Sequence, residues 1–210
     1  MNIRKNLLIA ALAMLLCLAG CGGGELVSLY DGDVAAYSHP DCGAAFMTPQ
    51  SWEKKSEDER SVVFVNGDNS ISLTVYYELA GFSYYSNQEL LDMGREICGQ
   101  ILAEPEILRE ENRSDMGGQL VTAVGSLAKP GPEEADAPAV CEVLVLSPLS
   151  AVRYYFVTVS TTAAYAENSR LLEEIYLSFF VNKTEDELYA DLATEPTEVQ
   201  QEDNDSQEAE

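Results

Sequence analysis

Basic side chains are scarce in this chain. Its 210 residues include 12 Lys and Arg against 36 Asp and Glu, which gives a formal net charge of −24 at pH 7. The deficit persists in residues 21–182, which hold 25 acidic and 9 basic side chains. A nucleic-acid-binding protein needs a basic surface to neutralise phosphates. The composition therefore argues against DNA or RNA as a partner, and we expect the acidity mainly to keep copies of the chain apart.

Histidine is almost absent, and this limits the catalytic chemistry that the chain can offer. The single histidine, His39, lies three positions before Cys42. A nearby imidazole can lower the pKa of a thiol and activate it as a nucleophile. Neighbours in sequence rarely have the geometry of a catalytic pair, however. We predict no catalytic residues, and hydrolysis by His39 and Cys42 is the least favoured alternative.

Local metal-binding motifs are also missing. The residue types of a Cys3His zinc site are present in His39, Cys42, Cys98 and Cys141. No C-x-x-C pair brings two of these ligands together, and the Asp pairs in 31–33 and 203–205 lack the rest of a calcium loop. We predict no metal site and no cofactor. We expect Cys42, Cys98 and Cys141 to be buried. The sequence leaves open whether one pair of them forms a disulfide.

The chain begins with an apolar run that is too short to cross a bilayer. Residues 7–18 form 12 apolar positions, whereas a transmembrane helix needs about 20. Arg4 and Lys5 precede this run, and the small residues Ala19 and Gly20 follow it. A basic start, a short apolar stretch and small residues in this order are typical of a signal peptide.

The end of this segment, Leu18-Ala19-Gly20-Cys21, resembles the lipobox of bacterial lipoproteins. The resemblance implies cleavage between Gly20 and Cys21 and a diacylglyceryl group, with palmitate-type chains, on the Cys21 thiol. Two acyl chains hold a protein stably at a membrane, where one chain would not. An ordinary secretory signal is the alternative. We expect the mature protein to be anchored through Cys21 at the extracytoplasmic face of a bacterial membrane.

Composition divides the chain into four segments. Residues 1–20 are the expected signal peptide, and residues 21–36, which include four glycines, are a lipidated N-terminus and linker. Residues 37–183 have the length of one domain. Residues 184–210 contain eleven acidic side chains and no Lys or Arg, so we expect a disordered tail, with helix at most in its first turns.

The central segment shows the periodicity of strands and helices. Residues 71–79 alternate apolar and polar side chains, as a half-buried strand does, and Asn66-Gly67 before them predicts a hairpin with residues 61–65. Further strands are expected at 44–47, 106–111, 119–127, 140–146 and 151–160. Helices are expected from a Ser86–Glu89 capping box to Pro105, and at 163–180. Short connections favour an α+β fold in which helices flank a central, largely antiparallel sheet, as an α/β/α sandwich.

This order of elements resembles the PsbP-like family. The likeness starts in Ala45-Phe46-Met47-Thr48-Pro49-Gln50-Ser51-Trp52 and continues to the closing helix that ends Ile175-Tyr176-Leu177-Ser178-Phe179. It implies a sheet with helices on both sides. The best-known members are accessory proteins of larger assemblies, including photosystem II, and the family offers no shared catalytic residues.

We therefore expect a membrane-anchored, non-catalytic binding or accessory module for an envelope protein or complex. The alternative is a small-molecule or polymer-binding lipoprotein that serves a transporter or a cell-wall enzyme. Tyrosines that could line a recognition surface are Tyr30, Tyr37, Tyr84, Tyr85, Tyr154 and Tyr155. For any one of them, packing in the core is the stronger expectation.

The anchor can be tested by removing the thiol that carries it. We expect Cys21→Ala to shift the protein from the detergent phase to the aqueous phase in a Triton X-114 partition of host membranes, because the acyl chains have no attachment site. Incorporation of labelled palmitate should be lost as well. A variant that stays in the detergent phase would show that Cys21 is not the anchor.

Overall fold

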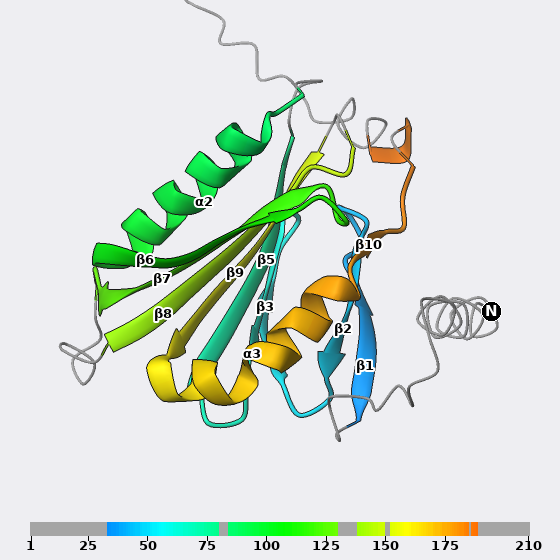
Figure 1. Ribbon diagram of the computed structural model, residues 1–210. Helices are drawn as coiled ribbons and strands as arrows, with labels where there is room; N and C mark the ends of the chain where they lie inside the picture. The colour runs from blue at the N-terminus through cyan, green and yellow to red at the C-terminus, as the bar shows by residue number, and fades with distance from the viewer. Residues whose placement is uncertain (1–32, 80–83, 130–137, 150–151, 185, 189–210) are drawn as a thin grey trace, which may run out of the picture.

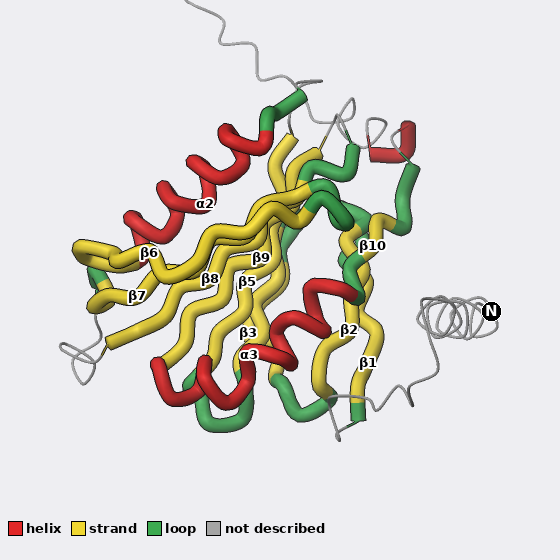
Figure 2. The backbone as a smooth tube through the Cα atoms, viewed as in Figure 1, coloured by secondary structure: helices red, strands yellow, loops and turns green. Residues whose placement is uncertain are grey.

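The computed structural model describes residues 33–79, 84–129, 138–149, 152–184 and 186–188. Its elements, in chain order, are β1 (Val34–Ser38), β2 (Ala44–Pro49), β3 (Glu53–Glu57), β4 (Ser61–Val65), β5 (Ile71–Leu79), α2 (Asn87–Ile101), β6 (Leu102–Arg113), β7 (Gly118–Leu127), β8 (Pro138–Leu146), β9 (Val152–Thr161), α3 (Thr162–Leu177) and β10 (Phe180–Val181). Figure 1 and Figure 2 show how they are arranged.

Two antiparallel sheets build the fold. The larger has seven strands in the order β3-β4-β5-β9-β8-β7-β6, and the smaller has the order β1-β2-β10. Helix α2 packs on one face of the larger sheet, while α3 and the small sheet cover the other face (Figure 1). The predicted α+β class and the antiparallel sheet are confirmed.

Strand periodicity accounts for the centre of the sheet. In β5, Ile71, Leu73 and Val75 are buried on the α3 side, and the predicted pairing of β4 with β5 is present. The positive φ of the connecting turn lies at Asn69 (60°) and not at Gly67, where we expected it. The reason is that the Asn66 side chain accepts the N–H of Ile71 at 2.9 Å and closes a longer turn.

The two helices begin as predicted but end earlier. Ser86 and Glu89 form the capping box of α2, which stops at Ile101, and Pro105 lies inside β6. Helix α3 ends at Leu177 and not at residue 180, because Ser178 stops it. The Ser178 hydroxyl donates to the Ile175 carbonyl at 2.6 Å and accepts the Met47 N–H at 2.8 Å, which directs the chain into β10.

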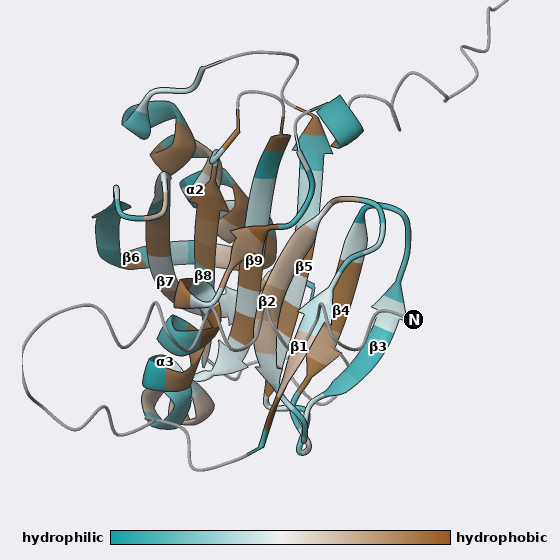
Figure 3. Ribbon diagram, turned by 90° about the vertical axis from the view of Figure 1, so that its right-hand side faces the viewer, coloured by the Kyte–Doolittle hydropathy of each residue, from teal (hydrophilic) through white to brown (hydrophobic). Residues whose placement is uncertain are grey.

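Strands β1, β3 and β10 were not predicted. All five residues of β3 are exposed and β1 has no buried residue, so neither shows the alternation of a half-buried strand. Figure 3 shows β3 as largely hydrophilic, in contrast to β8 and β9. Strand β1 also begins within the expected linker. At the other end, residues 186–188 form a helical turn in which Leu188 is buried, so the domain extends beyond residue 183.

The core consists of two layers separated by the sheet. On the α3 side, the ring of Phe156 lies 5.3 Å from those of Phe46 and Phe179 and 5.8 Å from that of Tyr176. On the α2 side, Leu90 and Cys98 pack on β7 and β8. None of the helices in the described part of the chain combines the length and apolarity needed to cross a membrane.

Two glycines of α2 provide a matched test of this packing. A Cβ at Gly94 would lie 2.8 Å from Cγ2 of Val121, while a Cβ at Gly99 would have no atom within 4 Å. We expect Gly94→Ala to lower the free energy of unfolding by about 1–3 kcal/mol, because the helix must move off the sheet. Gly99→Ala should raise it by about 0.5–1 kcal/mol through helix propensity. Urea unfolding measures both, and equal effects would contradict the docking of α2.

Candidate interaction surface

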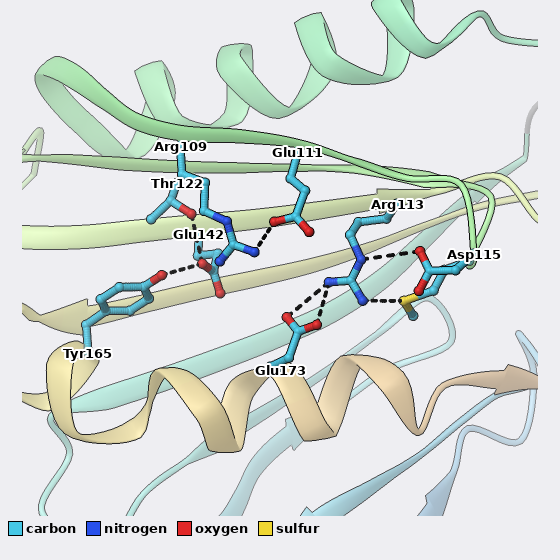
Figure 4. A network of polar contacts seen from close by, with 9 residues as sticks. Arg109, Glu111, Arg113, Asp115, Thr122, Glu142, Tyr165 and Glu173 are labelled. Carbon is cyan, nitrogen blue, oxygen red and sulfur yellow. Dashed lines mark hydrogen bonds and ion pairs between the residues drawn. The ribbon is translucent and has the colours of Figure 1, made fainter. Parts of the chain in front are cut away.

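A buried arginine joins the β6–β7 hairpin to α3. Arg113, at the end of β6, is 4% exposed, and its Nη1 lies 2.8 Å from a carboxylate oxygen of Glu173 on α3. Its Nε lies 3.4 Å from the carboxylate of Asp115, and its Nη2 lies 3.4 Å from the sulfur of Met116. These contacts hold the tip of the hairpin against the helix (Figure 4).

A second polar cluster lies deeper along the same helix. Glu142 of β8 is 3% exposed and accepts hydrogen bonds from the hydroxyls of Thr122 at 2.8 Å and Tyr165 at 2.6 Å. Burial and then the bond to Glu142 raise the pKa of Tyr165 to about 12. Arg109 and Glu111 form an ion pair on strand β6 (Figure 4). Arg109, Glu111 and Arg113 of β6 are thus committed to partners within the chain.

Two shallow hollows of about 270 Å³ each lie along α3, and both have Leu177 in their lining. We call them together the α3 groove. The polar hollow is lined by Arg109, Glu142, Ser169, Arg170, Glu173, Glu174 and Leu177. The apolar hollow is lined by Asp115, Met116, Pro148, Leu177, Phe179, Phe180 and Val181. Leu177 is 55% exposed and Phe180 is 40% exposed, so large apolar side chains face solvent here.

The α3 groove was not predicted from the sequence, although one of its residues has a recognisable signal. Glu142 interrupts an apolar strand and has the same parity as Leu144 and Leu146, so it lies on a buried face. A buried carboxylate requires polar partners. The rest of the groove has no such signal, because the pair that joins its two walls, Arg113 and Glu173, is 60 positions apart in the sequence.

His39 and Cys42 lie together, but they do not form a nucleophile and a base. The Nδ1 of His39 is 3.2 Å from the N–H of Asp41 and 3.4 Å from the N–H of Cys42, and accepts from these backbone donors. Its Nε2 lies 2.9 Å from the Asp58 carbonyl. Burial also raises the pKa of the Cys42 thiol to about 11. This histidine closes a turn, and the geometry does not activate the thiol.

The three cysteines are free and buried, as expected for structural thiols. Cys98 of α2 and Cys141 of β8 are neighbours on the α2 side, with the Cys98 sulfur 3.9 Å from the Cys141 carbonyl. Their contact lowers the pKa of Cys98 and raises that of Cys141. Cys42 belongs to the core on the opposite side of the sheet. Among the described residues, no three His, Cys, Asp or Glu side chains are grouped so that they could hold a metal ion.

Most of the candidate recognition tyrosines pack internally. Tyr154 and Tyr155 are 0% and 3% exposed, so both pack in the core, which was the stronger expectation, because both faces of β9 are covered. The ring of Tyr85 lies 4.3 Å from the guanidinium carbon of Arg153, and the Tyr37 hydroxyl donates to Glu57. Among the candidate tyrosines that the structure describes, Tyr84, at 90% exposed, is the one that is available for recognition.

Several predicted features lie outside the described residues. These include the signal peptide, the cleavage site at Gly20 and Cys21, Tyr30, and the tail from residue 189. The lipid attachment at Cys21 therefore stays a prediction.

Comparison with known proteins identifies the fold of this chain but assigns it to no family. No protein-family model matches the sequence, and neither does any curated protein. Among solved structures, the Ran-binding protein Mog1p of Saccharomyces cerevisiae superposes with a TM-score of 0.55 at 12% identity, over 73% of this chain and 97% of its own. Cyanobacterial PsbP (CyanoP) of Synechocystis sp. PCC 6803 has a TM-score of 0.49 at 17% identity, over 79% of this chain and 99% of its own.

The likeness to Mog1p shows a shared α+β architecture at a level of identity that carries no activity with it. The predicted fold class is thus confirmed. Membership of the PsbP-like family stays a prediction from the motifs.

Thiol labelling tests the assignment of the cysteines. In the folded protein at pH 8, we expect Cys42, Cys98 and Cys141 to react slowly with a thiol reagent, because all three are buried. The pKa of Cys42 is raised from 9.0 to about 11, which lowers its thiolate fraction by about a hundredfold below pH 9. Unfolding in urea should release all three thiols for labelling. Recovery of a single thiol after unfolding would instead reveal a disulfide.

Proposed function

We propose that this protein is a lipid-anchored module on the extracytoplasmic face of a bacterial membrane, where it acts without catalysis by binding an envelope protein or complex. The lipobox-like run that ends at Cys21 supports the location. The single observation that carries the binding role is the α3 groove, in which Leu177 and Phe180 face solvent. A contiguous patch of exposed apolar side chains is a feature of surfaces that contact other proteins.

The size and shape of the groove favour a protein over a small molecule. Each of its hollows measures about 270 Å³, below the range of about 300–1,000 Å³ that is usual for small-molecule sites. Mog1p is a Ran-binding protein, so a chain with this fold can act by binding another protein. The internal partners of His39 and the raised pKa of Cys42 also disfavour catalysis by this pair.

Crosslinking in intact host membranes, followed by affinity purification of the full-length protein, tests this proposal. We expect one envelope protein or complex to be recovered with the anchored form. The Cys21→Ala variant should recover much less of it, because it loses its enrichment at the membrane. If no protein co-purifies and a small molecule stays bound to the domain, the binding-module proposal fails and the carrier of a ligand for a transporter or cell-wall enzyme replaces it.

A further inference from the structure

The apolar hollow of the α3 groove is bordered by acidic side chains. Of its lining residues, only Asp115 is charged, and its side chain is 59% exposed. Glu173 and Glu174 lie four and three positions before Leu177, so they share the helix surface that leads into this hollow. Arg113, which is 4% exposed, contacts both Asp115 and Glu173 from within the protein. Solvent therefore meets an apolar patch with a negative rim.

These carboxylates are not balanced within the chain. Arg113 is shared between Asp115 and Glu173, so one cation serves two anions. Glu174 takes part in none of the side-chain hydrogen bonds or ion pairs found among the described residues. Arg170 and Arg109 line the other hollow together with Glu173 and Glu174, and Arg170 lies four positions before Glu174 on the same helix. The carboxylates left for a positive group at the Leu177 end are therefore Asp115, which shares Arg113 with Glu173, and Glu174.

The helix backbone favours a cation at the same place. The C-terminal end of a helix carries a partial negative charge, which basic side chains in the last turn usually complement. Helix α3 has no basic residue in its last turn and carries Glu174 there instead. In the isolated chain, the carboxylate and the negative end of the helix repel each other. A bound cation would weaken this repulsion.

We propose that the α3 groove binds a basic amphipathic segment of the partner protein, in which Lys or Arg flanks a bulky apolar residue. The apolar side chain enters the hollow beside Leu177 and Phe180, and the basic side chains pair with Asp115 and Glu174. The tail of this chain is excluded as the occupant because residues 184–210 contain no Lys or Arg. The inference rests on the proposed binding function and names the chemistry of its partner.

Substitutions at the partly exposed Glu174 and the exposed Leu177 allow a test that leaves the fold intact. Glu174→Arg and Leu177→Ser change the rim and the hollow, while Glu173 is left unchanged because it pairs with the buried Arg113. The matched controls are Glu167→Arg, on an exposed position of the same helix, and Leu108→Ser, on β6 at the same 55% exposure as Leu177. All four variants should unfold in urea at the wild-type midpoint.

The first measurement uses the full mature chain in detergent and a synthetic peptide with Leu and Lys at helical spacing. We expect fluorescence anisotropy to show binding that weakens with salt, and a loss of affinity of about tenfold in Glu174→Arg and in Leu177→Ser. The control variants should keep the wild-type affinity, and a peptide with Glu in place of Lys should not bind. Equal losses in the control variants, or no binding of the Lys peptide, would overturn the proposal.

The second measurement separates this inference from the proposed function. Purification from crosslinked host membranes is repeated with Leu177→Ser and Leu108→Ser in the anchored protein. Loss of the wild-type partner in Leu177→Ser alone supports the groove as its docking site. Full recovery of that partner with Leu177→Ser overturns the groove assignment while the binding function stands. If wild type recovers no partner, the proposed function itself fails.

Discussion

The ion pair between Arg113 and Glu173 is the interaction on which the surface of this protein depends. A guanidinium that is 4% exposed has lost most of its hydration, and the effective cost is several kcal/mol unless close anions compensate for it. Glu173 comes from a helix 60 residues later, so the pair can form only when α3 lies across the sheet. Because Asp115 also contacts Arg113, the β6–β7 hairpin and α3 are held as the two walls of one groove.

The sheet separates the supporting side of the molecule from the side that we assign to binding. On the α2 side, the helix packs against β7 and β8 closely enough that a Cβ at Gly94 has no room. On the α3 side, the aromatic core around Phe156 supports the helix from below, and Ser178 turns the chain into β10. This turn brings Phe180 beside Leu177, so the same residues that end the helix complete the apolar hollow.

Local sequence patterns predicted the elements whose pattern is complete within a short segment. They did not predict the elements that form only through contacts with distant parts of the chain. The alternation in residues 71–79 and the Ser86–Glu89 capping box were sufficient because each is complete within a short segment. Strand β10 has two residues and exists only through its pairing with β2, so no periodicity could reveal it. The groove depends on Arg113 and Glu173, whose approach no spacing rule predicts. The lipid anchor at Cys21 lies outside the described residues and rests on the sequence alone.

The central claim is that an anchored module presents the α3 groove to an envelope protein, and photocrosslinking within living cells tests it most directly. A photoreactive amino acid at position 177 is compared with one at position 108, which is equally exposed but lies on β6 outside the groove. The account predicts a crosslink from position 177 to one envelope protein and none to that protein from position 108. A crosslink from position 108 alone, or from neither position, would contradict it.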